Sequence, residues 1–167
     1  MDFEFQPKTL PAVMRGPRVE RRRVLIGGSA FWGTLVEDGE QAGKLKLDDG
    51  RIVDPAGLPH LPPVSPSKII AVHISYRSRS METRNKPKPT ETPTYFTKPP
   101  TSLNGHLGEI HKPADCTYLN YEGEYAVVIG RTARNVTPDE AWDCIEGFCP
   151  ALDMGLQDFR DTDQGSM

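Results

Sequence analysis

Sixteen of the 167 residues are proline, and fifteen are glycine. Proline fixes the φ angle and has no backbone N–H, so it is excluded from helix interiors and from central strands. A chain with this much proline is limited to short elements joined by loops, and strands are favoured over helices. The length allows one ordinary domain, or a small domain joined to part of a larger one.

The composition excludes several classes of protein. With 37% hydrophobic and 26% charged residues, the chain resembles a soluble globular protein. Its apolar runs are shorter than the roughly 18 residues of a membrane span, and its first ten residues are polar where a signal peptide is apolar. A net charge of −3 argues against a non-specific nucleic-acid binder. We therefore expect a cytoplasmic protein without a nucleic-acid or membrane partner.

The first third of the chain is predicted to hold an arm and a small domain. Residues 1–23 lack apolar periodicity and form an extended arm, whose arginines at 21–23 are either a solvated flank or a contact for an acidic partner or a phosphate. From residue 24, short β-rich runs alternate with turns at residues 37–39 and 48–50, which predicts a small antiparallel β domain. Five prolines between residues 55 and 66 form a stiff linker, so this domain and its linker occupy residues 24–64.

The second region, residues 65–167, contains the strongest elements. Residues 68–75 form an apolar run expected to be a strand buried on both faces, and residues 94–98 and 121–130 are further strands. The polar segment between the first two is a mobile lid or an ordered active-site loop. Thr137-Pro138-Asp139-Glu140 is a capping box, which predicts a helix that ends near Gly147.

Two glutamates on the 121–130 strand are the first candidates for chemistry. Glu122 and Glu124 flank Gly123, and the two-residue period of a strand places both carboxylates on one face. Two negative charges at such a short distance are unfavourable unless a cation lies between them or one of the carboxylates is protonated. Oxygen ligands suit Mg²⁺ or Mn²⁺. The spacing is compatible with a metal site and also with two solvated glutamates on an edge strand.

Asp153 is a candidate third ligand because it follows a short apolar run after the predicted helix. A strand, helix and strand between Glu124 and Asp153 would bring the aspartate back beside the pair. The alternative is that Asp153 begins a solvated acidic tail.

Ordered motifs across the second region resemble those of the fumarylacetoacetate hydrolase family. The matching parts are a strand that leads into Ser75-Tyr76, Arg79 with Glu82, the segment YFTKPPTSL at 95–103, the segment YEGEYAVVIGR at 121–131, and Gly147-Phe148 leading to Asp153. The resemblance implies an α+β, mostly β, fold, in which the small antiparallel domain precedes the first half of a mixed β-sandwich roll. Family members continue well past the metal aspartate, so we expect the rest of that roll to be absent from a chain that stops at Met167.

The resemblance also implies a metal site and an assembly. In the family, two strand glutamates and a later aspartate hold Mg²⁺ or Mn²⁺, which assigns the metal to Glu122, Glu124 and Asp153. It implies a homodimer. A 2-oxo acid can chelate such an ion, and the cation then stabilises the enolate that forms when a proton, CO₂ or an acyl group leaves.

Arg79 stands where hydrolytic relatives resembling this chain carry a histidine. Arginine stays protonated near neutral pH, so it cannot act as a general base, although it can bind a carboxylate with two hydrogen bonds. Glu82 matches the family's glutamate and is the candidate acid or base. His73 lies nearby on a strand and is expected to be a core residue rather than a base.

Further site residues follow from the resemblance. Lys98 lies where the family has a lysine lining the site, and it would stabilise negative charge on the substrate. We expect Arg79, Lys98, Ser102 and Tyr76 to bind substrate, and Glu82, Arg79 and Lys98 to serve catalysis.

The sequence thus supports a metal-dependent decarboxylase or isomerase of unsaturated oxo-di- or tricarboxylates in aromatic-acid breakdown. One alternative is a hydrolase that cleaves C–C bonds in acylpyruvates or fumarylacetoacetate. Another is a catalytically incompetent fragment or binding module.

Overall fold

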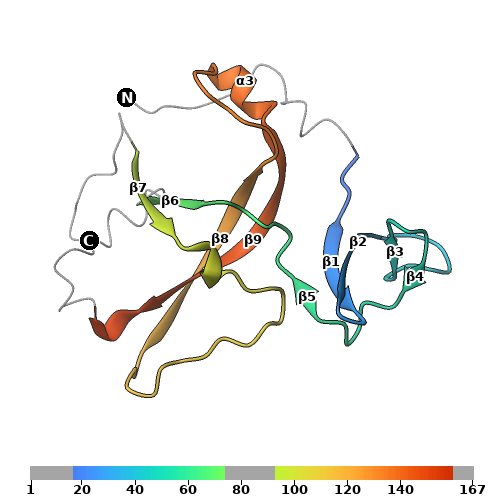
Figure 1. Cartoon of the computed structure of the whole chain (residues 1–167), viewed down its shortest axis with the longest axis horizontal. Coiled ribbons are helices and arrows are strands. Elements are labelled where there is room, and N and C mark those ends of the chain that lie inside the picture. The colour runs from blue at the N-terminus through green and yellow to red at the C-terminus, as the bar shows by residue number, and fades with distance from the viewer. Residues whose placement is uncertain (1–16, 74–92, 160–167) are drawn as a thin grey trace. The chain divides into compact units, whose positions relative to one another are not determined.

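The computed structural model of the chain describes residues 17–73 and 93–159. These residues are mostly strand, as predicted, and they form two compact units: one of residues 22–73 and 93–108, and one of residues 17–21 and 109–159 (Figure 1). The predicted domain boundary at residue 64 does not coincide with this division and stays a prediction. The elements are β1 (Arg21–Ile26), β2 (Ser29–Leu35), β3 (Leu45–Leu47), β4 (Ile52–Val53), β5 (His60–Leu61), β6 (Ile69–His73), β7 (Thr94–Lys98), η1 (Pro100–Ser102), β8 (Leu119–Ile129), α3 (Pro138–Trp142), β9 (Ile145–Leu156) and η2 (Gln157–Phe159).

The first unit contains a five-stranded sheet in the order β4-β3-β2-β1-β5. Its core is small: Val24, Leu45 and Leu47 are buried, and half-buried apolar residues pack around them. The predicted turns are confirmed, because Gly39 and Gly50 adopt φ angles of +80° and +92°, a region that glycine enters without steric cost.

The proline-rich segment is not only a linker. Within it, β5 pairs with β1, placing Val24 opposite His60. Prolines lie on both sides of this two-residue strand, which forms the edge of the sheet. An edge strand tolerates neighbouring prolines because it needs hydrogen-bond donors on one side only. The prediction of a linker without sheet pairing is therefore wrong at β5.

A second, two-stranded sheet joins β6 and β7, which pair from Ile69 opposite Lys98 to His73 opposite Thr94. The strands were predicted, but the prediction that β6 is buried on both faces is wrong. Ile70 is 57% exposed and Val72 is 48% exposed. In the described residues β6 pairs with β7 alone, and two strands leave one face of the ribbon open.

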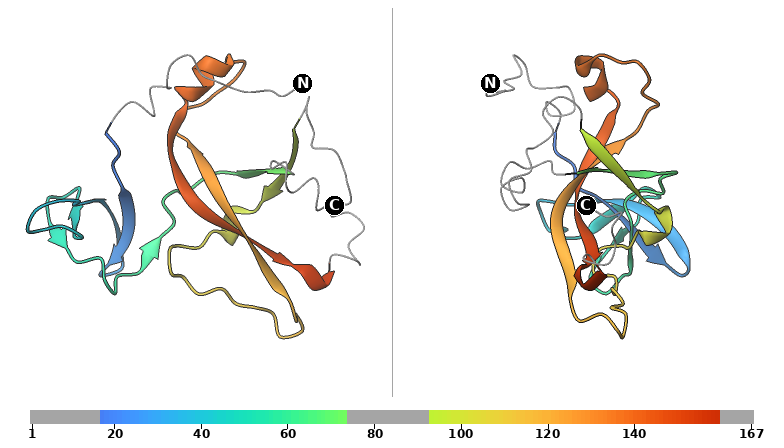
Figure 2. Two further views of the ribbon diagram at one scale, coloured as in Figure 1. Left: turned by 180° about the vertical axis from the view of Figure 1, so that it is seen from behind. Right: turned by 90° about the vertical axis from the view of Figure 1, so that its left-hand side faces the viewer.

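The second unit is built on a long ribbon in which β8 and β9 run antiparallel over their whole length (Figure 2). β8 coincides closely with the predicted strand at 121–130. The ribbon twists in both views of Figure 2, as expected for paired strands of L-amino acids. An irregularity in register between Val128 and Ile129 marks the end next to the connecting helix.

The connecting helix α3 has the predicted start and an earlier end. Thr137 and Glu140 form both hydrogen bonds of the capping box: the Thr137 backbone N donates to Glu140 Oε2 at 2.8 Å, and the Glu140 backbone N donates to Thr137 Oγ1 at 3.3 Å. The helix ends at Trp142, not near Gly147, because Ile145 already pairs with Ile129 as the first residue of β9. Pairing with β8 thus replaces the predicted last turn of the helix.

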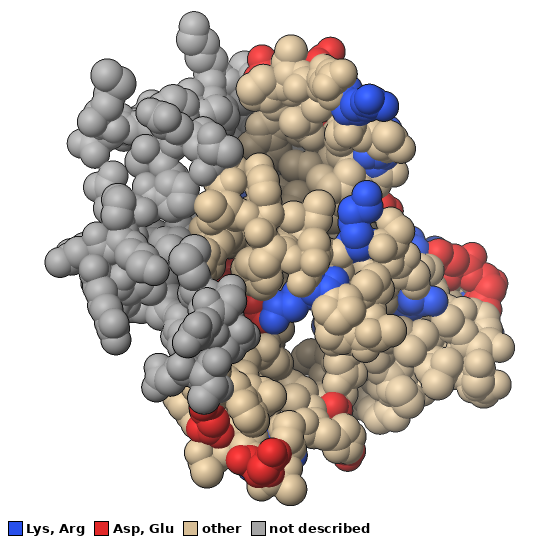
Figure 3. All heavy atoms as spheres, turned by 60° about the vertical axis from the view of Figure 1, so that its left-hand side comes forward, with Lys and Arg blue, Asp and Glu red and all other residues tan. Residues whose placement is uncertain are grey.

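Charged side chains are scattered. On the face drawn in Figure 3, basic and acidic residues are interspersed with uncharged ones, and neither sign covers the face continuously. Within residues 17–73 and 93–159, none of the helices has the length and apolar character required to cross a membrane.

Candidate metal centre

The register of the β8–β9 ribbon places the three predicted metal ligands on one face. Glu122 is the direct cross-strand partner of Asp153, and Glu124 is opposite Ala151. Directly opposed residues of an antiparallel pair share a face, as do residues two apart on one strand. Glu122, Glu124 and Asp153 therefore lie on the same side of the ribbon. We call this side, with all its residues, the carboxylate face. Asp153 is a strand residue and does not begin a solvated tail.

The carboxylate face is partly covered. Glu122, Glu124 and Asp153 are half-buried, and so are the other residues on that side of both strands. Opposed side chains in such a pair have Cβ atoms about 5 Å apart, and like charges directly opposite each other are unfavourable. A bound cation would offset this repulsion, and three carboxylates are a ligand set suited to Mg²⁺ or Mn²⁺. The residues present thus fit the ion that the family resemblance implies.

The side chains do not converge into a formed metal cage. In the part of the chain that the structure describes, no group of three or more His, Cys, Asp or Glu side chains is arranged to hold a metal ion. The backbone brings the three carboxylates to one face, and ion binding would require their side chains to rotate toward a common point.

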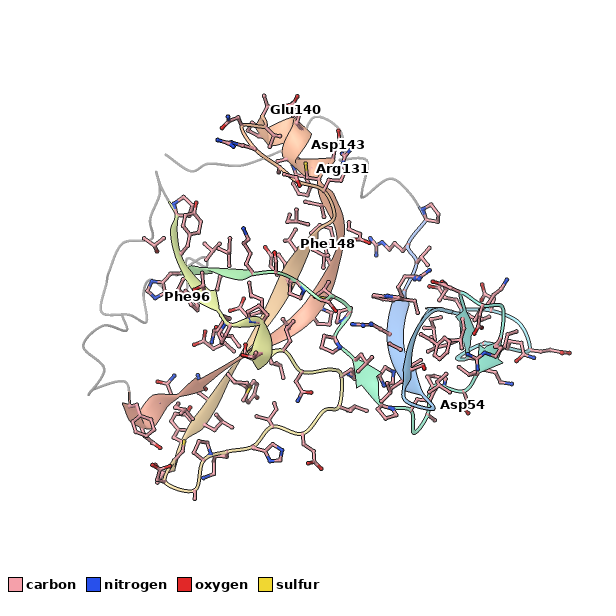
Figure 4. All side chains as sticks on the ribbon, in the orientation of Figure 1. Asp54, Phe96, Arg131, Glu140, Asp143 and Phe148 are labelled. Atoms are coloured by element: carbon pink, nitrogen blue, oxygen red, sulfur yellow. The ribbon has the colours of Figure 1, made fainter. Side chains whose placement is uncertain are left out.

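Lys98, which was predicted to stabilise negative charge on the substrate, lies in the other unit at the end of β7. Its ammonium nitrogen is 5.7 Å from the centroid of the Phe96 ring, within the range of a cation–π interaction. The ring of His73 meets the same phenyl ring edge-on at a centroid distance of 6.1 Å. Phe96, labelled in Figure 4, is the cross-strand partner of Ala71. His73 is half-buried rather than fully buried.

Ser102 is part of the short turn η1. Its hydroxyl donates a hydrogen bond to the Pro99 carbonyl oxygen at 2.8 Å, and its oxygen can still accept one from a ligand. Tyr76, Arg79 and Glu82 lie outside the described residues. The candidate residues therefore form two groups: the carboxylates in one unit, and Lys98 with Ser102 in the other.

Asp158 is a residue that sequence reasoning missed. It follows β9 and binds the segment that precedes β8. Its carboxylate accepts hydrogen bonds from the Thr117 backbone N, from Thr117 Oγ1 at 2.8 Å and from the Tyr118 backbone N at 3.0 Å. These donors, led by the Tyr118 N–H, lower the pKa of Asp158 to about 2. Because Leu119 pairs with Leu156, Asp158 lies opposite Thr117. The contact therefore follows from the register of the two strands and could not be found from the local sequence.

Two of the three cysteines have raised pKa values. Cys116, Cys144 and Cys149 are free, and burial raises the pKa of Cys116 and of Cys149. A raised pKa lowers the thiolate fraction at neutral pH, and the thiolate is the nucleophile. Cys116 and Cys149 are therefore poor candidates for covalent catalysis.

At the opposite end of the ribbon, charged residues stabilise the connection around α3. Glu140, Asp143 and Arg131 lie close together there, as Figure 4 shows, and the Arg131 guanidinium donates a hydrogen bond to the Asp143 carbonyl oxygen. Hydrogen bonds from Thr137 lower the pKa of Glu140. These contacts stabilise the turn that connects β8 to β9.

Comparison with known proteins identifies relatives of this chain. Residues 68–167 match the family described as Fumarylacetoacetate (FAA) hydrolase C-terminal. An uncharacterized protein of Archaeoglobus fulgidus is 38% identical over 141 residues, which are 84% of this chain and 54% of that protein. The homoprotocatechuate catabolism bifunctional isomerase/decarboxylase of Escherichia coli is 30% identical over 116 residues, which are 70% of this chain and 26% of that protein.

A solved structure shares the fold. The 5-carboxymethyl-2-hydroxymuconate delta-isomerase of Mycobacterium smegmatis superimposes with a TM-score of 0.72 at 30% sequence identity, covering 89% of this chain and 59% of that chain. This chain therefore spans about half the length, or less, of the relatives it matches. The likeness confirms the predicted α+β, mostly β, fold, and the match covers the whole candidate metal centre. The chain belongs to the fumarylacetoacetate hydrolase family.

Proposed function

We propose that the chain belongs to a divalent-metal-dependent enzyme that stabilises an enolate of a 2-oxo di- or tricarboxylic acid. The proposed reaction is decarboxylation or keto-enol isomerisation in the breakdown of aromatic compounds. The observation that carries the proposal is the cross-strand pair of Glu122 and Asp153, with Glu124 on the same half-buried face. The isomerase and decarboxylase names of the relatives support this reaction class.

Glu122, Glu124 and Asp153 would hold Mg²⁺ or Mn²⁺. A bound ion supplies positive charge that favours the enolate over the keto acid. Three protein ligands would leave coordination positions on the ion for substrate oxygens or water, because Mg²⁺ prefers six oxygen ligands.

The other residues act on the substrate directly. On the family resemblance, Lys98 would add a second positive charge at the substrate; within its own unit its ammonium nitrogen lies 5.7 Å from the centroid of the Phe96 ring. Arg79 binds a substrate carboxylate, and Glu82 moves the proton between carbon and oxygen. Tyr76 and Ser102 donate or accept hydrogen bonds at the substrate. Arginine in place of histidine at position 79 disfavours hydrolysis, which needs a base to activate water.

Turnover by the purified 167-residue chain tests the proposal. With Mg²⁺ and an unsaturated oxo-tricarboxylate, we expect loss of CO₂ or migration of the double bond, and no cleavage of an acylpyruvate. Lys98→Met should lower kcat, whereas Lys68→Met, an exposed lysine just before β6, should not. Cleavage of acylpyruvate alone would favour the hydrolase alternative. A chain that binds the ion and converts no substrate would be a binding module.

A homodimeric assembly and a cytoplasmic location belong to the same proposal. The first follows from the family resemblance and the second from the composition of the chain.

A further inference from the structure

The turn that follows η1 is built around Asn104. This residue is exposed, and its Oδ1 atom accepts a hydrogen bond from the Gly105 backbone N at 2.8 Å. The Gly108 backbone N donates to the Gly105 carbonyl oxygen at 3.0 Å, which closes the turn. The side-chain amide of Asn104 therefore lies beside the backbone nitrogen of the next residue.

Two glycines make room for this turn. A Cβ atom added to Gly108 would lie 2.1 Å from Asn104 Oδ1, and one added to Gly105 would lie 1.9 Å from the His60 carbonyl oxygen. The backbone at Gly105 thus rests directly on β5. Because a side chain at position 105 would collide with the backbone of that strand, packing restricts the residue after Asn104 to glycine.

An asparagine followed by glycine carries the groups for a reaction within the chain. The glycine backbone nitrogen loses its proton to solvent and attacks the side-chain carbonyl carbon. A new C–N bond forms, the bond to the side-chain nitrogen breaks, and ammonia leaves with a proton taken from water. Water then opens the resulting cyclic imide at either of its carbonyl carbons, which gives aspartate or isoaspartate. Water is the only co-reactant, and no oxidant or reductant is needed.

The turn meets the geometric requirement of this reaction. Groups held at near-attack distance react far faster than groups that must first find each other. Asn104 Oδ1 is already 2.8 Å from the attacking nitrogen, and the terminal torsion of asparagine is soft, so rotation of the amide turns its carbon toward that nitrogen. Gly105 places no side chain in the path, and the exposure of Asn104 admits water.

The other asparagines lack this combination of features. Asn120 is a half-buried residue of β8 and precedes Tyr121. Asn135 is exposed but precedes Val136, whose branched side chain crowds the attacking nitrogen. Asn85 precedes a lysine and lies outside the described residues. The chain thus has one asparagine followed by glycine, and it is the one in the turn on β5.

We propose that Asn104 is a site of spontaneous deamidation, which converts the turn to aspartate and isoaspartate forms as the protein ages. Isoaspartate adds a methylene group to the main chain between residues 104 and 105, where Gly105 rests on the His60 carbonyl oxygen. The reaction also adds a negative charge two residues before His106, whose ring meets the His60 ring edge-on at 5.3 Å. The modified turn therefore loses its close fit on β5.

The test follows the purified full chain during storage at mildly alkaline pH by tandem mass spectrometry of its peptides. We expect Asn104 to be converted at least tenfold faster than Asn120 and Asn135, with both products present. The rate should increase with pH, because the attacking nitrogen must lose its proton. The chain unfolded in guanidinium chloride is the reference. The folded chain should react at least as fast, since the turn holds the two groups together.

Variants connect the modification to the packing on β5. The aged unmodified chain should melt at a lower temperature than the fresh chain. Asn104→Ser retains an oxygen that can accept the Gly105 N–H but has no amide to lose, so its melting temperature should not change on storage. Asn135→Gly is the matched control: Asn135 is also exposed, its φ of +53° suits glycine, and its replacement should not change the rate at Asn104.

Two results on the unmodified chain would overturn the proposal, and neither requires a variant that folds. One is a rate at Asn104 less than tenfold above those at Asn120 and Asn135. The other is a slower reaction at Asn104 in the folded chain than in guanidinium chloride, which would show that the turn protects the site. An unchanged melting temperature after full conversion of Asn104 would contradict the loss of fit on β5. These measurements involve no metal ion and no turnover, so they are independent of the proposed function.

Discussion

Glu122 on β8 and Asp153 on β9 are direct cross-strand partners. A slip of one residue in this pairing would move Asp153 to the opposite face of the ribbon, because successive side chains of a strand alternate. The candidate metal centre therefore depends on the register, and the register depends on both ends of the ribbon. Asp158 joins the two strands at one end, and the capped helix α3 connects them at the other.

Asp158→Asn should make the chain less stable at neutral pH and reduce its sensitivity to acid. The folded state lowers the pKa of Asp158 from 3.8 to about 2, so the unfolded state binds a proton more readily. The ionised group therefore stabilises the fold above pH 3.8, and this contribution disappears as the pH falls toward about 2. Urea unfolding between pH 2 and pH 7 measures it. Asp115→Asn, an exposed loop carboxylate, is the control, and equal loss in both variants would contradict the prediction.

Thr137→Ala should destabilise the connection between β8 and β9. The substitution leaves the backbone N–H of Glu140 without the Thr137 oxygen, and loss of such an N-cap costs about 0.5–2 kcal/mol. The urea midpoint of the purified chain measures the change. Thr137→Ser keeps the hydroxyl and should stay close to the unmodified chain. A serine variant as unstable as the alanine variant would show that the cap does not stabilise α3.

Leu45→Ala should be among the most damaging changes in the first unit. Leu45 is completely buried in a core with Val24 and Leu47. Removing a buried leucine side chain typically costs about 2–5 kcal/mol. Ile52→Ala, on the adjacent strand and 47% exposed, should cost much less. Hydrogen exchange of the β1 and β3 amides follows this unit separately, and similar exchange in the two variants would contradict the assignment of the core.

The stability of the first unit should decrease below about pH 6.5. Burial is the main cause of the lowered pKa of His60, and electrostatic interactions with His106 and Arg22 lower it further. The His60 and His106 rings meet edge-on at 5.3 Å, and the His60 Nε2 atom is buried without a hydrogen-bond partner. The unfolded chain binds this proton more readily than the folded chain. The contribution of neutral His60 to the stability of the fold is therefore complete above pH 6.5, the ordinary pKa of histidine, and is lost as the pH falls below it.

NMR titration of the histidine ring protons measures the pKa of His60 directly, and His60→Phe should remove this part of the pH dependence of unfolding. A titration of His60 at or above the ordinary histidine value would contradict the prediction.

Strong local signals in the sequence correctly predicted the β-rich runs of the small domain, the strands β6, β7 and β8, and the capped start of the helix. β7 and β8 follow from alternation and β-branched residues, and α3 begins at the capping box. Its end was wrong because pairing of Ile145 with Ile129 is a tertiary effect that a local pattern does not contain. The pairing of β5 with β1 was missed for the same reason, since prolines on either side of a strand resemble a linker.

Three of the predicted site residues can be assessed in the ribbon. The two-residue spacing of Glu122 and Glu124 predicted their common face, whereas the place of Asp153 required the register of two strands. The role of Asp158 is a property of the same register and leaves no mark in the local sequence. Lys98 was predicted by resemblance, and its contact with Phe96 became visible only in the paired strands β6 and β7.

Binding of Mn²⁺ by the purified chain tests the central claim most directly, by electron paramagnetic resonance titration of the free ion. We predict one bound Mn²⁺ per chain, and at least tenfold weaker binding after Glu124→Gln or Asp153→Asn. Glu146→Gln is the control, because Glu146 is an exposed carboxylate on β9 outside the carboxylate face. A folded chain that binds no Mn²⁺, or whose binding Glu146→Gln weakens as much as Glu124→Gln does, would contradict the account.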